Sequence, residues 1–174
     1  MKRQRVRNLS SKSRTENCND IEKARAYAFL LLKFRLRSEN ELLGRLKQKG
    51  FSPELSLNLV NFLKDKQFID DRLFTKGWIA SRLKKPFGLR RIRQELAQKG
   101  LDKQIIEEAF VRVKEDYDES GVIRELAKKR FSRLNGIELL KAKARVYAYL
   151  LRRGFSPDII GEVVSKITRN VPKF

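Results

Sequence analysis

The chain has 174 residues, and its 41 Lys and Arg outweigh 21 Asp and Glu to give a formal net charge of +20. It contains no histidine and one cysteine, Cys18, which excludes an intrachain disulfide, a Cys/His zinc site and a nucleophile activated by histidine. No apolar run approaches the ~20 residues that a membrane span needs, and the lone thiol fits a reducing cytoplasm. The excess of positive charge favours a polyanionic partner such as nucleic acid.

Residues 1–19 form a basic leader with hardly any apolar side chains. Such a segment cannot bury enough surface to offset the entropy of ordering, so we predict that it is disordered. The leader can serve as a phosphate-contacting arm, and a purely solubilising role is an equally good interpretation. Its cations are Lys2, Arg3, Arg5, Arg7, Lys12 and Arg14.

From Asp20 onward the sequence predicts helices, organised by a motif that occurs three times. The segment 46–51 returns at 96–101 and at 150–155, each time as Leu-x-x-x-Gly followed by an apolar residue. Apolar residues at offsets 5, 9 and 13 after each glycine form one stripe of an amphipathic helix. A regular recurrence of this kind is typical of helical repeat proteins.

Turn and cap residues separate these predicted helices. Each motif ends on a glycine that can take the left-handed conformation found after a helix C-terminus: Gly50, Gly100 and Gly154. Ser52-Pro53 and Ser156-Pro157 then supply an N-cap and a first helical residue, and Asp102 is the cap in the middle copy. A leading helix precedes each motif, and in the second copy either Asp70 or Asp71 caps it.

The predicted fold is therefore all-α, an array of nine helices in three three-helix, helix-turn-helix-like repeats. The repeats are placed at 20–66, 67–116 and 117–170, and the acidic run 115–119 marks the start of the third. A unit of about 50 residues is marginally stable by itself. Neighbouring repeats should therefore stack and share buried faces.

The candidate binding residues are cations in three groups. The central basic segment has no acid and consists of Arg82, Lys84, Lys85, Arg90, Arg91 and Arg93. The first-repeat patch consists of Arg35, Arg37, Arg45, Lys47 and Lys49. The third-repeat patch consists of Lys128, Lys129 and Arg130. Because the groups recur at corresponding parts of the repeats they can form one basic track, although each is also compatible with a solvated helix face.

The central basic segment carries the strongest functional signal. Gly88 lies between its two halves and can cap the following helix, whose first amides would then point outward toward an anion. The next cations, Arg90, Arg91 and Arg93, oppose the helix dipole at that end. A sequence selected for stability alone favours acids there, so the conflict indicates a binding function.

Catalytic and cofactor motifs are missing from the sequence. It has neither a Gly-x-Gly nor a Gly-Lys-Ser/Thr segment, so it offers no phosphate cradle for a dinucleotide or a nucleoside triphosphate. Asp70-Asp71 is the one carboxylate pair that suggests a metal, but adjacent residues on a helix diverge by about 100° and a cap is the better interpretation. We predict a protein that is not an enzyme and that binds no cofactor.

Two classes of binding function remain. Three-helix units with a glycine turn resemble helix-turn-helix DNA readers, which need base-reading side chains on a recognition helix. The helices after Gly50 and Gly100 are poor in such side chains on their outer faces, which favours binding to a DNA backbone or a protein–DNA filament. The alternative is a stand-alone DNA-binding protein with a transcriptional or architectural role.

Several segments of the chain together resemble the RecX family of recombination regulators. They are Arg37-Ser38-Glu39-x-Glu41-Leu42, Lys49-Gly50-Phe51, Ile69-Asp70-Asp71 with Phe74, and Lys85-x-Phe87-Gly88-x-Arg90-Arg91-Ile92-x-x-Glu95-Leu96-x-x-Lys99-Gly100-Leu101. The match runs in order over 24–113 and more loosely to 167. Leu73, where an acidic or polar residue is common, and Thr75, where Ala is usual, depart from the pattern.

The resemblance implies an elongated array of three-helix repeats and a function in homologous recombination and DNA repair. Such a protein would modulate the RecA recombinase by binding RecA filaments on single-stranded DNA across subunits, usually inhibiting them, without catalysis. We expect a monomer in the bacterial cytoplasm that binds single- and double-stranded DNA irrespective of sequence. The sequence does not determine whether it caps, disassembles or stabilises filaments.

Overall fold

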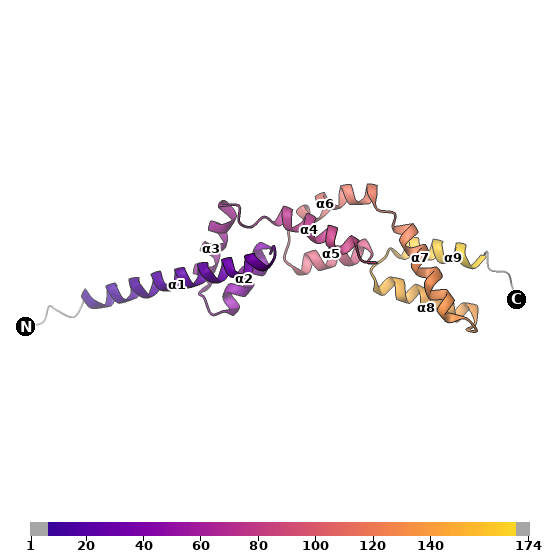
Figure 1. The fold of residues 1–174 in the computed structure, drawn as a ribbon, viewed down its shortest axis with the longest axis horizontal. Helices are drawn as coiled ribbons and strands as arrows, with labels where there is room; N and C mark the ends of the chain where they lie inside the picture. The colour runs from indigo at the N-terminus through magenta and orange to yellow at the C-terminus, as the bar shows by residue number, and fades with distance from the viewer. Residues whose placement is uncertain (1–6, 170–174) are drawn as a thin grey trace, which may run out of the picture. The chain divides into compact units, whose positions relative to one another are not determined.

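The computed structural model describes residues 7–169, which form nine α-helices and one short 3₁₀ turn with no strand (Figure 1). The helices are α1 (Arg7–Phe34), α2 (Glu39–Gln48), α3 (Pro53–Asp65), α4 (Asp71–Leu83), α5 (Leu89–Gln98), α6 (Lys103–Asp116), α7 (Glu119–Phe131), α8 (Leu139–Arg152) and α9 (Pro157–Arg169), with the turn η1 (Ser132–Leu134) between α7 and α8. The predicted all-α class is confirmed. The chain divides into two compact units, residues 1–74 and 75–174.

The first unit is a three-helix core in which α1 contacts both α2 and α3. Its centre is apolar and consists of Ala24, Ala28, Leu42, Leu46, Leu59, Val60, Leu63 and Ile69, all buried. Ala24 and Ala28 lie one turn apart on α1 and are fully buried, so their small side chains let the neighbouring helices approach closely. Aromatic pairs extend this core, with Tyr27 packed on Phe51 and Phe29 edge-on to Phe68.

The long first helix differs from the prediction of a disordered leader over 1–19. Residues 1–6 lie outside the described residues, but helix α1 begins at Arg7. The apolar positions of the first unit hold α1 from Ala24 onward. Once a helix is nucleated, each added residue forms one hydrogen bond at little further cost, so a polar segment can continue it.

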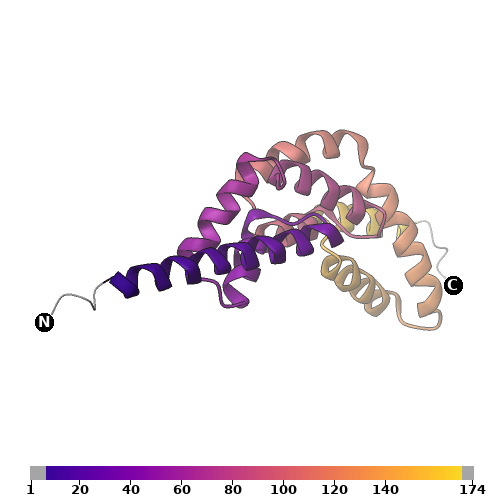
Figure 2. The same cartoon turned by 60° about the vertical axis from the view of Figure 1, so that its left-hand side comes forward.

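The second unit contains two packed groups of helices. Ile92, Leu96, Ile106 and Phe110 are buried on α5 and α6, which contact each other. Helices α7, α8 and α9 pack mutually, coloured orange to yellow in Figure 2. Their shared core consists of Ile123, Ala127, Val146, Leu150, Phe155, Ile160, Val163 and Val164.

The three glycine turns have the predicted geometry. Gly50, Gly100 and Gly154 have φ values of 100°, 74° and 82°, in the left-handed region that favours glycine. In the first turn, Gly50 N donates to Lys47 O at 3.0 Å and Phe51 N donates to Leu46 O at 3.2 Å. The same pair of bonds recurs at the other two glycines, so each motif ends in a Schellman turn that satisfies the last carbonyls of its helix.

The helix starts separate the roles of two adjacent acids. Asp70 Oδ1 accepts from the backbone amides of Arg72 and Leu73, at 2.7 and 3.0 Å, so Asp70 is the cap of α4. Asp71 Oδ1 instead accepts from the backbone amide of Glu39, at the start of α2, across 2.9 Å. The alternatives left by the sequence are thus resolved, since one acid caps its own helix and the other caps an earlier helix.

Candidate anion-binding cleft

The start of α5 lies against the turn between α8 and α9. Gly88 N donates to Arg153 O at 2.9 Å, and Arg90 N donates to Gly154 O at 3.2 Å. A Cβ atom added to Gly88 would lie 2.2 Å from Gly154 O, so only glycine permits this approach of two backbone segments. Gly88, which belongs to the segment that resembles RecX, therefore joins the start of α5 to the turn between α8 and α9.

The first amides of α5 are occupied by the protein itself. Leu89 N donates to Glu119 Oε1 at 3.3 Å, and the next amide, that of Arg90, is bound to Gly154. The sequence predicts that these amides point outward toward an anionic ligand, and this prediction is wrong. A carboxylate and a carbonyl from the third repeat already fill the positions that an anion would take.

Two of the predicted cations bind one carboxylate in the second unit. Arg82 Nε lies 2.6 Å from Glu95 Oε2, and Arg91 Nε lies 3.0 Å from Glu95 Oε1. Trp78 Nε1 also donates to Glu95, at 3.2 Å. Burial raises the pKa of Glu95, but the hydrogen bonds from Arg91, Arg82 and Trp78 outweigh it and lower the pKa overall.

Aromatic rings support the same cations. The Arg82 guanidinium lies 4.4 Å from the Trp78 ring centroid, and that of Arg91 lies 4.2 Å from the Phe87 centroid. Arg93 repeats the arrangement elsewhere, with Nε 3.0 Å from Glu107 Oε1 and its guanidinium 4.1 Å from the Phe110 centroid. Arg82 and Arg93 thus contribute to packing between helices, and Arg91 packs against its own helix and the loop before it.

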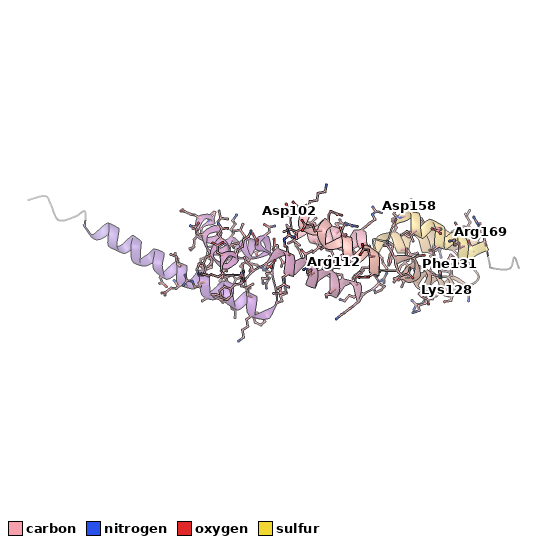
Figure 3. The ribbon with its side chains drawn as sticks, turned by 90° about the horizontal axis from the view of Figure 1, so that it is seen from above. Asp102, Arg112, Lys128, Phe131, Asp158 and Arg169 are labelled. Carbon is pink, nitrogen blue, oxygen red and sulfur yellow. The ribbon has the colours of Figure 1, made fainter. Side chains whose placement is uncertain are left out.

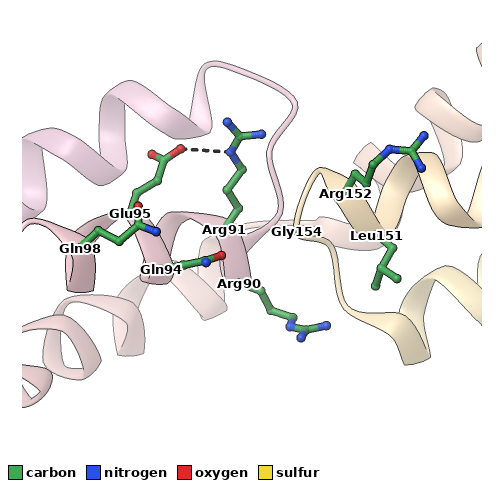
Figure 4. Close-up of a pocket in the computed structure, with 8 residues that line it drawn as sticks. All are labelled: Arg90, Arg91, Gln94, Glu95, Gln98, Leu151, Arg152 and Gly154. Carbon is green, nitrogen blue, oxygen red and sulfur yellow. Dashed lines mark hydrogen bonds and ion pairs between the residues drawn. The ribbon is translucent and has the colours of Figure 1, made fainter.

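A cleft of about 700 Å³ lies between α5 and the end of α8. Its lining residues are Arg90, Arg91, Gln94, Glu95, Gln98, Leu151, Arg152 and Gly154. Figure 4 shows Arg90 and Arg91 leaving α5 on different sides, with only Arg91 bound to Glu95. Arg90 and Arg152 are exposed, and neither has an ion-pair partner among the described residues. The cleft therefore presents two available guanidinium groups beside the amides of Gln94 and Gln98.

The remaining candidate residues are distributed over both units. In the first-repeat patch Arg35 pairs with Glu41 at 2.9 Å, Arg37 donates to Leu31 O at 3.3 Å, and burial lowers the pKa of Arg37. Arg45 donates to Gln48 at 3.2 Å, whereas the exposed Lys49 lies over Tyr27. The other exposed candidates are Lys47, Lys84, Lys85 and Lys129.

The third-repeat patch lies along α7. Lys128 is 3.6 Å from Glu125 on the same helix, near Phe131 (Figure 3). Arg130 is half-buried and lies over the Tyr149 ring, 5.2 Å from its centroid. These two cations therefore already contact the protein's own side chains, although Lys128 remains exposed.

Sequence reasoning missed the residues of α8 and its turn. Arg152 lines the cleft, and Arg153 donates to Pro86 O at 3.0 Å while its guanidinium lies 4.8 Å from the Tyr149 centroid. Gln94 and Gln98 were also missed. A signal for Arg153 was present, because each repeated motif places a cation directly before its glycine, as in Lys49, Lys99 and Arg153.

Two further properties concern the described residues alone. No helix in this part of the chain is long and apolar enough to cross a membrane. Across the same residues, no group of three or more His, Cys, Asp or Glu side chains is placed to hold a metal ion.

Comparisons with known proteins agree with this architecture. Family models for the first, second and third three-helix domains of RecX match residues 24–63, 70–109 and 117–164. Regulatory protein RecX of Chlorobium phaeobacteroides is 36% identical over 87% of this chain and 97% of its own. That of Chlorobium limicola is 30% identical over 86% of this chain and 92% of its own.

A crystal structure of RecX from Lactobacillus salivarius superposes with a TM-score of 0.75 at 23% identity, covering 87% of this chain and 99% of that one. This likeness concerns the fold. Three domain matches in the expected order, together with the identity to full-length relatives, establish the family. The chain therefore belongs to the RecX family of regulatory proteins.

Proposed function

We propose that the chain regulates the RecA recombinase by binding RecA filaments on single-stranded DNA and lowering their activity. The cleft between α5 and the end of α8 carries the proposal. Arg90 and Arg152 line it without ion-pair partners among the described residues, while Arg82, Arg91 and Arg93 are bound to Glu95 or Glu107. A guanidinium can bind two oxygens of one phosphate or carboxylate at once, which suits a DNA backbone or an acidic protein surface.

The composition of the chain supports a filament rather than a small ligand. The net charge of +20 favours binding to a long polyanion such as DNA, and this attraction weakens as the salt concentration rises. Exposed cations occur in both units, for example Lys47 in the first and Lys129 in the second. Several weak contacts to successive subunits and to the DNA between them would add up to tight binding without a single strong contact.

Inhibition would follow from a preference for one filament state. A regulator that contacts more than one subunit binds some subunit arrangements better than others, and it shifts the filament toward the arrangement it prefers. This mechanism requires no chemistry from the chain itself. The proposed regulator therefore hydrolyses no ATP and acts only on the recombinase's turnover.

The test measures recombinase ATP hydrolysis on filaments assembled beforehand on single-stranded DNA, so that competition for bare DNA is small. We expect the wild-type chain to lower the rate. The double variant Arg90→Ala/Arg152→Ala should need a concentration about tenfold higher for the same effect, as expected when two exposed ion pairs of about 0.7 kcal/mol each are removed. The matched control is Arg112→Ala/Arg124→Ala, which removes two exposed cations from α6 and α7 outside the cleft and should behave as wild type.

The same assay separates the alternative function. A stand-alone DNA-binding protein would bind bare DNA tightly and leave the assembled filament active. That outcome would replace the proposed regulator by a transcriptional or architectural protein. Equal loss of effect in the cleft variant and in its control would instead remove the cleft from the proposal.

A further inference from the structure

Two acids in different repeats make the same backbone contact. Asp71 is the first residue of α4 and accepts from the amide of Glu39, the first residue of α2, at 2.9 Å. Glu119 is the first residue of α7 and accepts from the amide of Leu89, the first residue of α5, at 3.3 Å. In each case an acid at the start of a leading helix binds the start of the middle helix of the preceding repeat.

Neither acid is needed as the cap of its own helix. Asp70 caps α4 through the amides of Arg72 and Leu73, and Asp118 caps α7 through the amide of Gly121 at 2.8 Å. The paired acids thus have separate tasks. The first stabilises its own helix start, and the second connects that helix to an earlier one.

Glu119 also binds a second helix start. Besides Leu89, its carboxylate accepts from the backbone amide of Ser156, directly before α9. One side chain on α7 therefore binds the starts of both α5 and α9. The hydrogen bonds from Gly88 to Arg153 and from Arg90 to Gly154 lie beside it and join the same two segments.

We propose that Glu119 is a positioning residue for the cleft, holding the start of α5 against the α8–α9 turn so that Arg90 and Arg152 line one opening of fixed width. Arg90 directly follows the amide that Glu119 binds, and Arg152 lies two residues before Gly154. The backbone segments that carry the two cations are therefore those that the carboxylate connects. The expected effect of Glu119 on anion binding rests on the proposed function, whereas its effect on the width of the cleft does not.

Removing the carboxylate would leave two partly enclosed amides without their acceptor. An unsatisfied amide costs free energy, and separation of the two segments would let water bind these amides, so the variant should favour more open arrangements. The remaining hydrogen bonds between the repeats include that from Tyr117 Oη to Phe87 O at 3.3 Å. They would preserve the fold but would no longer fix one distance between α5 and the α8–α9 turn. Loss of Glu119 should thus widen the range of cleft openings without removing any cation.

The first experiment measures that range directly in the full chain. Spin labels are attached to cysteines introduced at the exposed positions Ala97 on α5 and Asp158 on α9, in a Cys18→Ser background. Double electron–electron resonance should give a narrow distribution of label-to-label distances when Glu119 is present and a broader one in Glu119→Ala. Glu119→Gln keeps one acceptor oxygen, so its distribution should have an intermediate width. Glu115→Ala is the control for charge removal at an exposed site. An unchanged width in Glu119→Ala, with helicity preserved, would overturn the proposal.

The second experiment asks whether the positioning acts through the two cations. The affinity for a fluorescent oligo-dT strand is measured for four proteins. They are the wild type, Glu119→Ala, Arg90→Ala/Arg152→Ala, and the variant that combines all three substitutions. We expect Glu119→Ala to cause a loss on the order of fivefold in the wild-type background and none in the Arg90→Ala/Arg152→Ala background, because interacting sites are non-additive. An equal loss in both backgrounds would show that Glu119 does not act through the cleft. Failure of the chain to affect recombinase filaments would remove the proposed function while leaving the spin-label result intact.

Discussion

Arg82 Nε, in the last turn of α4, donates to Glu95 Oε2 on α5 across 2.6 Å. The side chains are only 25% and 17% exposed, so solvent screens this pair little. Arg82 belongs to the central basic segment. Because it binds Glu95 and lies over the Trp78 ring, it contributes to the packing of α4 against α5. Cations of one segment thus divide into those that hold the fold and those that remain available.

Replacing Arg82 should therefore affect stability. Arg82→Ala should lower the free energy of unfolding by about 2 kcal/mol, because it removes a charge-assisted hydrogen bond and a stacked guanidinium. Lys84→Ala, two residues away and exposed, should change it by less than about 0.5 kcal/mol. Urea unfolding followed by far-UV circular dichroism measures both. Equal effects of the two variants would show that the Arg82–Glu95 pair contributes nothing particular.

The contribution of Glu119 to stability should depend on pH with a defined sign. Burial raises the pKa of Glu119 above 4.5, against the amides of Leu89 and Ser156 and the charge of Arg93, which lower it. Between 4.5 and the raised value the folded chain binds a proton that the unfolded chain lacks, so stability rises as the pH falls through this window. The neighbouring Tyr117 stays neutral throughout this window, because burial raises its pKa above 10.0.

The measurement is the difference in unfolding free energy between wild type and Glu119→Gln. Subtracting the variant removes the contributions of all other groups, Asp71 included. We expect the difference to shift in favour of wild type as the pH is lowered from 7 toward 4.5. A difference that stays flat, or that shifts in favour of Gln, contradicts the prediction.

An unpaired charge among the buried side chains of α5 and α6 should unfold this part of the chain. Ile106 on α6 is 5% exposed, whereas Val111 on the same helix is 61% exposed. Ile106→Asp places an unpaired carboxylate in an apolar environment and should cost at least about 4 kcal/mol. Val111→Asp should cost less than about 1 kcal/mol. Thermal unfolding separates the two variants, and similar midpoints would place Ile106 outside the core.

Adding one methyl group at two glycines should have opposite effects. Gly44 lies inside α2 and a Cβ there would meet nothing within 4 Å, so Gly44→Ala should stabilise the chain by up to about 1 kcal/mol through helix propensity. A Cβ on Gly88 would lie 2.2 Å from Gly154 O, so Gly88→Ala should destabilise it by about 2 kcal/mol or more. Chemical denaturation distinguishes the signs. Tolerance of alanine at Gly88 would mean that the two segments separate easily.

The salt dependence of DNA binding should report the available cations. For single-stranded DNA, the slope of log affinity against log salt decreases in magnitude by about 0.7 for each phosphate that the protein no longer neutralises. Arg90→Ala/Arg152→Ala should thus make the slope shallower by about 1.4, whereas Arg93→Ala, whose cation is bound to Glu107, should change it little. Fluorescence anisotropy of a labelled oligonucleotide across a salt series gives the slopes. A larger change for Arg93→Ala than for the cleft variant would reverse the assignment.

The fold could be predicted because its determinants are local. The spacing of Leu46, Gly50 and the apolar residues after it specifies a helix end, a left-handed turn and the buried stripe of the next helix. Leu46 and Gly50 play those roles in the structure, with Leu46 fully buried and Gly50 at a φ of 100°. The same reasoning holds at 96–101 and 150–155, where Leu96 and Leu150 are also fully buried.

The site could be predicted only in part, because it depends on contacts between distant segments. The sequence shows cations at Arg90 and Arg91 but not that Arg91 binds Glu95, one turn later, while Arg90 faces a cleft completed by Arg152. The acid run that contains Glu119 was visible as a boundary between repeats. Nothing local indicates that its carboxylate binds an amide thirty residues earlier.

The hydrogen bonds between the start of α5 and the α8–α9 turn determine how the second unit can unfold locally. Stacked repeats commonly fray from an end, because each unit contacts only its neighbour. Here the amides of Gly88, Leu89 and Arg90 donate to Arg153, Glu119 and Gly154, so the beginning of α5 is protected by residues of the last repeat. Detachment of that repeat would expose these three consecutive amides together. The opening free energies obtained from their hydrogen–deuterium exchange should therefore converge on one value, that of a single cooperative opening.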